Sequence, residues 1–193
     1  MLGYPSGRAV TKERTRLHQI DREWLAASPF CILATSDSRG CCDASPKGDP
    51  AGSLIHVLDD VTIAIAERPG NKRADGYLNV LSNPHAGIIS LVPGRSDTLR
   101  VNGRARVVRD APFFNEMLVR GQRPILAMIL DIEQVFYHCS KAFMRSELWE
   151  PETWQPDKLT SRAAMTKALQ ETPETLEELE EYYDPANYAK GLY

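Results

Sequence analysis

The chain has 193 residues, enough for one full-sized domain with a buried core and too few for two ordinary domains. Hydrophobic residues make up 42% and charged residues 25%, as in typical globular proteins. The 23 Lys and Arg against 26 Asp and Glu give a formal net charge of -3. General nucleic-acid binders are usually strongly basic, so this balance argues against that class.

The negative charge is concentrated near the C-terminus. No Lys or Arg occurs from Ala168 to Ala189, whereas seven acidic residues do, so the rest of the chain carries a formal charge of +4 once those seven are taken from -3. We expect a mildly basic domain over residues 1–155 and an acidic, partly helical tail over residues 156–193. The seven acids are Glu171, Glu174, Glu177, Glu178, Glu180, Glu181 and Asp184.

Targeting, membrane and metal signals are weak. No apolar run approaches the ~20 residues that a membrane-spanning helix needs, and residues 1–16 are polar and basic, unlike a secretory signal. These features predict a cytoplasmic protein that does not bind membranes. The four cysteines lack the spacing of a zinc site, and a chain of this size needs no disulfide.

The first expected element is an amphipathic helix. Leu17, Ile20, Trp24 and Leu25 recur at helical spacing, and Pro29 ends the pattern. Several short runs rich in β-forming residues and separated by turn signals follow. The expected strands are 30–36, 42–45, 53–58, 61–66, 86–92, 98–108 and 125–139.

Helices are expected between and after these strands. Asn71 resembles the N-cap of a helix that ends near Asn83, and Asp110 could cap a short helix through Leu118. The apolar face of the first would comprise Ala74, Tyr77, Leu78 and Leu81. Further helices are expected at 140–148, 161–169 and 173–182. Hairpins predominate over regular strand–helix alternation, which favours an antiparallel barrel over a doubly wound sheet.

The segment Arg68–Asp75, R-P-G-N-K-R-A-D, is the first of four candidate binding spots. If Asn71 caps a helix, Lys72 and Arg73 lie in its first turn, where cations oppose the helix macrodipole. An anion such as phosphate at the helix start would explain them. The alternative is a pair of solvated cations with Asp75 as their local partner.

Two strands carry the next spots. In S-P-K-G-D, Lys47 would be a single aimed cation and Gly48 would allow close approach of a ligand, although an ordinary turn is the alternative. The segment Thr98–Val108 alternates, with Arg100 and two further arginines on its polar face, which could be solvated or line a cleft. Asn102-Gly103 in its middle predicts a bulge.

The fourth spot is His138–Trp149. Lys141 and Arg145 would share one helix face near a Trp, which suits an anionic or aromatic partner, unless they are merely solvated. Cys139 is a poor candidate nucleophile because the adjacent His138 would point elsewhere in a strand. P-loop, dinucleotide-binding, zinc-protease and serine-hydrolase motifs are absent from the sequence.

These four segments, in this order and spacing, resemble the FMN-binding split-barrel proteins of the pyridoxamine 5'-phosphate oxidase-like superfamily. The similar subgroup carries S-P-K-G-D, R-P-G-N-x-R-x-D, L-R-V-N-G-R-A and H-C-x-K-A-x-x-R-S-x-L-W. The resemblance covers roughly residues 21–154. It implies a mainly β, α+β fold: a six-stranded antiparallel split β-barrel with peripheral helices, acting as a homodimer with FMN at the subunit interface.

The resemblance also assigns cofactor contacts by motif. The first motif would contact the isoalloxazine or ribityl part of FMN, and the second would hold the phosphate. The third would supply the strand under the flavin, and the fourth would reach the flavin or substrate side, from this subunit or its partner. No catalytic side chain and no metal ligand is assigned. The nine residues concerned are Ser45, Lys47, Asn71, Lys72, Arg73, Thr98, Arg100, Lys141 and Arg145.

Three functions are compatible with these residues. The first is an FMN-dependent oxidoreductase that uses NAD(P)H or another small molecule, but not an authentic pyridoxamine 5'-phosphate oxidase, because the C-terminal R-L-H-D-R-like stretch of those enzymes is missing. The second is a non-catalytic FMN-binding module that stores or senses flavin. The third is an anion-binding or nucleic-acid module without flavin.

Overall fold

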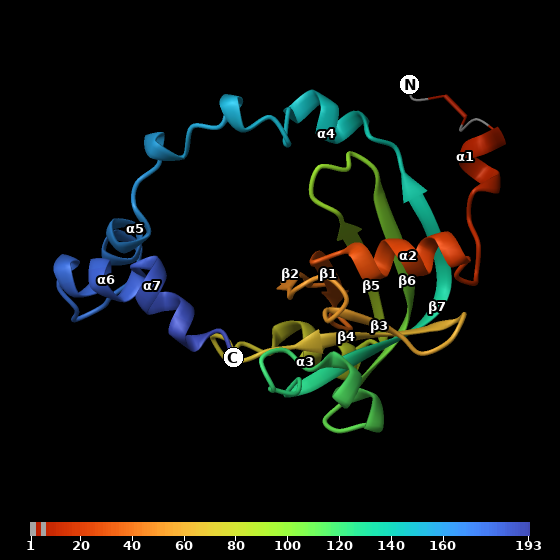
Figure 1. Ribbon diagram of the computed structural model, residues 1–193, viewed down its shortest axis with the longest axis horizontal. Coiled ribbons are helices and arrows are strands. Elements are labelled where there is room, and N and C mark those ends of the chain that lie inside the picture. The colour runs from red at the N-terminus through yellow and green to blue at the C-terminus, as the bar shows by residue number, and fades with distance from the viewer. Residues whose placement is uncertain (1–2, 5–6) are drawn as a thin grey trace.

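A computed structural model describes residues 3–4 and 7–193, so residues 1–2 and 5–6 of the expected 1–155 domain lie outside the described residues. Seven antiparallel strands form one curled sheet, in the order β2-β1-β5-β6-β7-β4-β3 (Figure 1). The expected antiparallel split-barrel class is confirmed, with seven strands instead of six, because a three-residue strand pairs on β4. The strands are β1 (Phe30–Ser36), β2 (Cys42–Gly48), β3 (Ile55–Val57), β4 (Thr62–Glu67), β5 (His85–Leu91), β6 (Thr98–Val108) and β7 (Leu126–His138).

The barrel core lies on the inner face of this sheet. Leu33, Ile88 and Val101 lie opposite one another across β1, β5 and β6, and each is at most 1% exposed. The long pair β6–β7 joins the two ends of the sheet, with the expected bulge at Asn102/Gly103. The alternating pattern of 98–108 therefore produced both a core face and an outer face, as predicted.

The helices decorate the barrel and continue beyond it. α2 begins with a capping box, in which the His18 ring accepts from Ile20 N at 3.2 Å and Asp21 accepts from His18 N at 2.7 Å. It buries Trp24 and Leu25 as predicted, while Ile20 is 59% exposed. The helical elements are α1 (Gly7–Thr11), α2 (Gln19–Ala27), α3 (Asp75–Ser82), η1 (Pro112–Met117), α4 (Lys141–Ser146), η2 (Pro151–Thr153), η3 (Pro156–Lys158), α5 (Arg162–Leu169), α6 (Leu176–Tyr183), α7 (Pro185–Tyr188) and η4 (Ala189–Gly191).

Two helix predictions were wrong in detail. α3 begins at Asp75 after Ala74, which makes no side-chain cap, so Asn71 is not its N-cap. Its buried residues are Gly76 and Val80, whereas Leu78 and Leu81 of the predicted apolar face are 60% and 74% exposed. The helix turns its other face to β1, where Asn79 Nδ2 donates to Thr35 Oγ1 at 3.1 Å. The segment expected as a helix capped by Asp110 is the 3-10 helix η1 instead.

Residues 141–193, here called the arm, extend beyond the barrel. The arm leaves the end of β7 and curves round to return near α3 and β4 (Figure 1). Its helices α5 and α6 pack on each other through Ala163, Thr166 and Leu179, all at most 5% exposed. The Thr166 hydroxyl donates to the Tyr183 hydroxyl at 3.1 Å. The helices expected at 161–169 and 173–182 are thus confirmed, with α6 starting at Leu176.

The bulge at Asn102/Gly103 leaves no room for a side chain at Gly103, which affects the stability of the fold. A Cβ at Gly103 would collide with the main-chain carbonyl of Asp131, which cannot swing away as a side chain could. We expect Gly103→Ala to lower the free energy of unfolding by about 1–3 kcal/mol in urea titrations. Gly48→Ala, where the nearest atom would lie 3.6 Å away, is the matched control and should change it little. Equal effects of the two substitutions would contradict this account of the bulge.

Candidate functional site

A cleft of about 230 Å³ lies between β2 and the loop that precedes α3. Four of the nine predicted cofactor residues line it, namely Ser45 and Lys47 from β2 and Asn71 and Arg73 from the loop. Asp43, Asp75 and Tyr77 line it as well, so the cleft offers two cations, two carboxylates, two hydroxyls and an amide. The first two motifs, separate in sequence, therefore meet at one place.

Lys47 is held inside this cleft by an ion pair. Its Nζ lies 2.5 Å from Glu67 Oε2, and the two side chains are only 11% and 20% exposed. The Tyr77 hydroxyl donates to the same carboxylate oxygen. Burial, and next the hydrogen bond to Glu67, raise the pKa of Tyr77, so this phenol stays a donor. Burial likewise raises the pKa of the neighbouring Cys31 thiol to about 12.

Glu67 and Tyr77 are site residues that the sequence reasoning missed. Glu67 ends the apolar strand β4 as its one charged residue, and that position next to R-P-G was the available signal. The sequence pattern places Tyr77 only on a helix face. Together they fix the position of Lys47, which is a held cation and not the freely solvated residue of a common turn.

The loop before α3 carries Asn71, Lys72 and Arg73. The Asn71 side chain accepts from Arg73 N at 3.0 Å, and Lys72 adopts the left-handed conformation with φ 61°. Arg73 pairs with Asp75 at 2.7 Å, with side chains 75% and 46% exposed. The two cations thus precede the helix and do not lie in its first turn, so the expected conflict with the macrodipole does not arise. Asp75 is the local partner that the alternative interpretation named.

Arg68 anchors this loop to the barrel. Its side chain is 9% exposed and lies 2.6 Å from Asp49, which is 1% exposed at the end of β2. It also donates to the carbonyl of Met117 at 2.6 Å and to that of Gln122 at 3.2 Å. A buried guanidinium requires such partners, and here they tie the loop, β2 and η1 together.

Thr98 and Arg100 lie on the opposite face of the sheet from Lys47. In the register, Lys47 is opposite Cys31 and Ser90 on the inner face. Arg100 is opposite Ile89, which is 36% exposed on the outer face. The Arg100 guanidinium lies 4.4 Å from the centre of the Phe136 ring, and its Nε is buried without a hydrogen-bond partner.

Lys141 and Arg145 form a third group on α4, at the far end of β7 (Figure 1). Both are exposed, and α4 has six residues. The nine predicted residues therefore lie in three places on one chain: the cleft and its loop, the outer face of β6, and α4. One copy of the chain does not bring them together.

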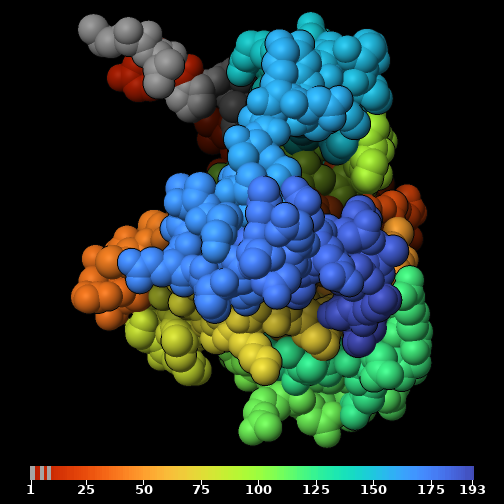
Figure 2. Space-filling view, turned by 90° about the vertical axis from the view of Figure 1, so that its left-hand side faces the viewer, coloured from red at the N-terminus to blue at the C-terminus, as the bar shows by residue number. Residues whose placement is uncertain are grey.

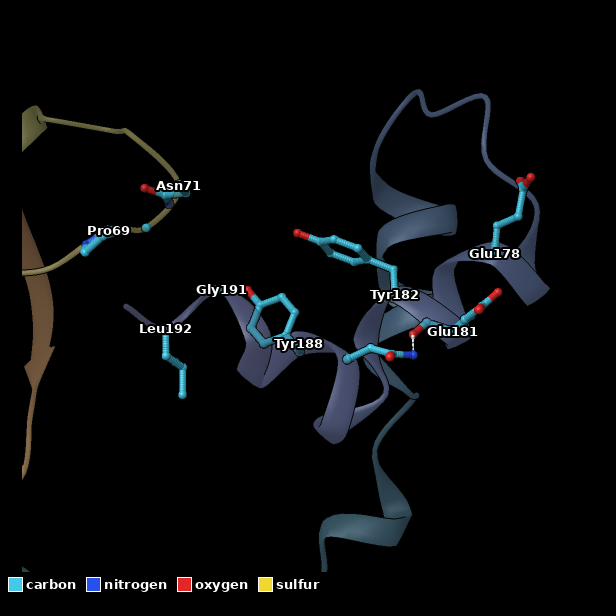
Figure 3. A pocket seen from close by; sticks show the side chains of 10 residues that line it. Pro69, Asn71, Glu178, Glu181, Tyr182, Tyr188, Gly191 and Leu192 are labelled. Atoms are coloured by element: carbon cyan, nitrogen blue, oxygen red, sulfur yellow. Dashed lines mark hydrogen bonds between the residues drawn. The ribbon is translucent and has the colours of Figure 1, made fainter. Parts of the chain in front are cut away.

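A second cavity, of about 680 Å³, lies on the other side of the same loop (Figure 3). Pro69 and Asn71 line it from the barrel, and Tyr182 and Tyr188 line it from the arm. The two tyrosine rings extend toward the loop, whereas Glu178 points away from it (Figure 3). The returning arm therefore comes close to the loop of the second motif.

The residues at these places fit a flavin mononucleotide. The pair Arg73–Asp75 is exposed, and such pairs contribute only about 0–1 kcal/mol, so a phosphate could replace Asp75 at little cost. The buried Nε of Arg100 lacks an acceptor, and a carbonyl oxygen of a bound ring would provide one.

The sequence profile of the pyridoxamine 5'-phosphate oxidase family matches residues 17–139, more than half of the chain. The chain belongs to this family. Among curated proteins, none matches it. The match covers the barrel and ends where the arm begins, so the family accounts for the sheet and not for residues 141–193.

Solved structures show the same fold. A Lactobacillus delbrueckii protein, named as a candidate pyridoxamine 5'-phosphate oxidase, is 23% identical, with 65% of this chain and 99% of that chain covered and a TM-score of 0.50. HupZ of Group A Streptococcus is 18% identical, covering 63% of this chain and 93% of that chain, also with a TM-score of 0.50. Nearly all of each protein aligns with about two thirds of this family member.

Residues 3–4 and 7–193 contain neither a membrane-spanning helix nor a metal-binding cluster. Helices there are all too short or too polar to cross a bilayer. In the same part of the chain, no group of three or more His, Cys, Asp or Glu could hold a metal ion.

On the outer face of the sheet, the Phe136 ring lies between Arg100 and His138. The titration of His138 tests whether Arg100 lies close to it. Burial, and next the charges of Arg100 and Lys12, lower the pKa of this imidazole below 6.5. The unfolded chain therefore binds a proton that the folded chain resists, so the free energy of unfolding should fall as the pH drops through about 6.5.

The corresponding variant is Arg100→Met. Removing its charge should raise the pKa of His138, as followed by NMR titration of the imidazole proton. Arg104→Met, on the same strand and exposed, is the control and should leave it unchanged. An unshifted His138 in the Arg100 variant would contradict the proximity of the two groups.

Proposed function

We propose that this family member is an FMN-binding flavoprotein and an oxidoreductase that acts on an unidentified small molecule. The observation that carries the proposal is the meeting of Ser45, Lys47, Asn71 and Arg73 in one cleft. These residue types suit an anionic, polar cofactor. Their positions match the two family motifs that the sequence placed about 20 residues apart.

The loop before α3 would hold the phosphate. Asn71, Lys72 and Arg73 offer two cations and an amide at one exposed turn. Arg73 would exchange Asp75 for the phosphate, and Arg68 would keep the loop in place during the exchange. Charge-assisted hydrogen bonds of this kind are among the stronger ones in proteins.

The ring and its ribityl chain would extend toward Ser45 and Lys47. Glu67 and Tyr77 hold Lys47 in position, so its charge acts at a fixed point. The flavin, when bound, supplies the electron chemistry, and the protein supplies orientation and charge. The site therefore requires no catalytic acid–base pair from the chain.

The proposed active unit is a homodimer with FMN at the subunit interface. Thr98 and Arg100 lie on the sheet face opposite Lys47, and they would contact the flavin held by the cleft of a second copy. Lys141 and Arg145 would approach the flavin or substrate side from that second copy as well. NAD(P)H or another small molecule would be the electron donor.

The absorbance spectrum of the purified protein tests the flavin assignment. We expect flavin bands in the visible blue, or their appearance when FMN is added. A colourless protein that does not take up FMN would contradict the proposal. Anaerobic addition of NADH or NADPH should then bleach the bound flavin. Binding without any reduction by a broad panel of donors would favour storage or sensing of FMN instead.

Arg73→Ala tests the phosphate site. Losing a charge-assisted hydrogen bond should weaken FMN binding by about 1.5–3 kcal/mol, measured by fluorescence titration. Arg123→Ala is the matched control, because Arg123 also makes an exposed pair, at 2.8 Å from Asp110, outside the cleft. Equal FMN affinity in the two variants would contradict the assignment of the phosphate to this loop.

A further inference from the structure

The cavity of about 680 Å³ beside the loop before α3 has two walls that share one anchor. Arg68 fixes the loop wall to Asp49. The Tyr193 hydroxyl donates to the same Asp49 at 3.0 Å, and the centre of its ring lies 5.8 Å from the Arg68 guanidinium. The Arg120 guanidinium lies 5.3 Å from the centre of that ring as well. The end of the arm and the loop are therefore held in fixed positions relative to each other.

The arm wall of this cavity presents two aromatic rings. Tyr182 is 59% exposed and Tyr188 is 54% exposed, and both rings extend toward the loop (Figure 3). Their centres are 5.6 Å apart and their planes meet at 85°, so the two rings form a corner. Seen from the side of the arm, α6 and α7 lie over the segment that carries the loop (Figure 2). A flat ring that enters this corner stacks on one tyrosine and meets the edge of the other.

Hydrogen-bonding groups and positive charge lie at the rim of the cavity. The Asn71 side-chain oxygen accepts from Arg73 N, which leaves its amide nitrogen to donate to a ligand. Lys72 is exposed next to Asn71 on the loop. On the arm wall, Lys190 donates to the Asn187 side chain at 2.8 Å. Each wall therefore contributes one exposed lysine.

The two acids that line the cavity face away from the loop. The Glu178 carboxylate accepts from Thr175 N at 2.7 Å and completes the capping box of α6. The Glu181 side chain extends in the same direction (Figure 3), while its main-chain carbonyl accepts from Asn187 Nδ2 at 2.9 Å. The charge next to the loop is therefore that of the cations, which favours a ligand that combines a flat ring with an anionic group.

We propose that this cavity binds an adenosine phosphate group, with its adenine ring on Tyr182 and Tyr188 and its phosphate between Lys72 and Lys190. Stacking on aromatic side chains is favourable for every base. Asn71 lines both this cavity and the cleft of the proposed flavin, so the group would lie directly beyond the flavin phosphate. That position selects adenosine, the group that follows this phosphate in FAD. The volume lies within the range of about 300–1,000 Å³ that is usual for small-molecule sites.

The group has two possible sources. It arrives either as the adenylate half of FAD, joined to the flavin, or as a separate adenine nucleotide bound beside FMN. The first source rests on the proposed function, whereas the second does not require a flavin.

Calorimetric titrations of the full chain with FMN, FAD and AMP test the site. If the group is joined to the flavin, we expect FAD to bind about tenfold more tightly than FMN. If it is separate, we expect FAD and FMN to bind equally and AMP to bind as well, with or without FMN present. Equal binding of FAD and FMN together with no binding of AMP would overturn the proposal.

Tyr182→Ala removes one stacking surface. Binding of FAD or AMP should weaken about tenfold, while the affinity for FMN should not change. Because Tyr182 is largely exposed, the variant should keep the circular dichroism spectrum of the parent chain. Tyr188→Ala, on the next helix, should have the same effect. Tyr4→Ala is the matched control, because Tyr4 is fully exposed and lies outside the cavity. Unchanged affinities for FAD and AMP in both cavity variants would contradict the proposal.

Photolabelling locates the bound ring. The full chain is irradiated with 8-azidoadenosine 5'-phosphate, and the labelled peptides are identified by mass spectrometry. We expect the label on the peptides that contain Tyr182 and Tyr188, and we expect excess AMP to prevent it. Labelling confined to other peptides would overturn the placement of adenine in this cavity.

The outcomes separate this site from the proposed flavin. A chain that binds FMN, shows no preference for FAD and does not bind AMP would support the flavin and overturn the adenosine site. A colourless chain that binds AMP through Tyr182 would do the reverse.

Discussion

The buried pair of Arg68 and Asp49 is the contact on which the rest of the site depends. Two charges that are 9% and 1% exposed would be costly if unpaired, and losing one partner of such a pair costs about 3–5 kcal/mol. Arg68 also binds the carbonyls of Met117 and Gln122, and its guanidinium lies 5.8 Å from the ring of Tyr193. The Arg68 side chain thus contacts the end of β2, η1 and Tyr193, and links them to the loop before α3. The positions of Lys47 and Arg73 relative to each other follow from it.

The sequence predicted the sheet well, because alternation reports directly on which face of a strand is buried. The run Thr98–Val108 gave the correct strand, the correct inner residues and the bulge at Asn102/Gly103. Sequence patterns were weaker for α3, whose packing depends on where β1 lies. The spacing of Leu78 and Leu81 predicts a core face, yet the residues of α3 that are buried against the barrel are Gly76 and Val80. Asn71 looks like a helix cap, but its side chain closes a turn four residues before the helix begins.

For the site too, the sequence indicates the residues involved but not how the fold brings them together. The motifs indicate the segments that form the cleft, and the family that they resemble is the one to which the chain belongs. They could not show that Lys47 is paired with Glu67, since these residues are 20 positions apart and meet only through the barrel. Nor could they show that Arg100 and Lys47 lie on opposite faces of the sheet, which follows from the register of four strands. That separation is the reason for proposing that two chains build each site.

The claim that each site draws on two chains is tested most directly by mixing two variants. Arg73→Ala removes a cleft residue, Arg100→Ala removes an outer-face residue, and each variant alone should bind FMN weakly. In a mixed dimer, one site would carry both substitutions and the other would carry neither. The account predicts that mixing after subunit exchange restores a fraction of sites with the parent affinity for FMN, measured by fluorescence titration. If the mixture binds no more tightly than the two variants apart, both residues serve the same chain's site and the two-chain account is wrong.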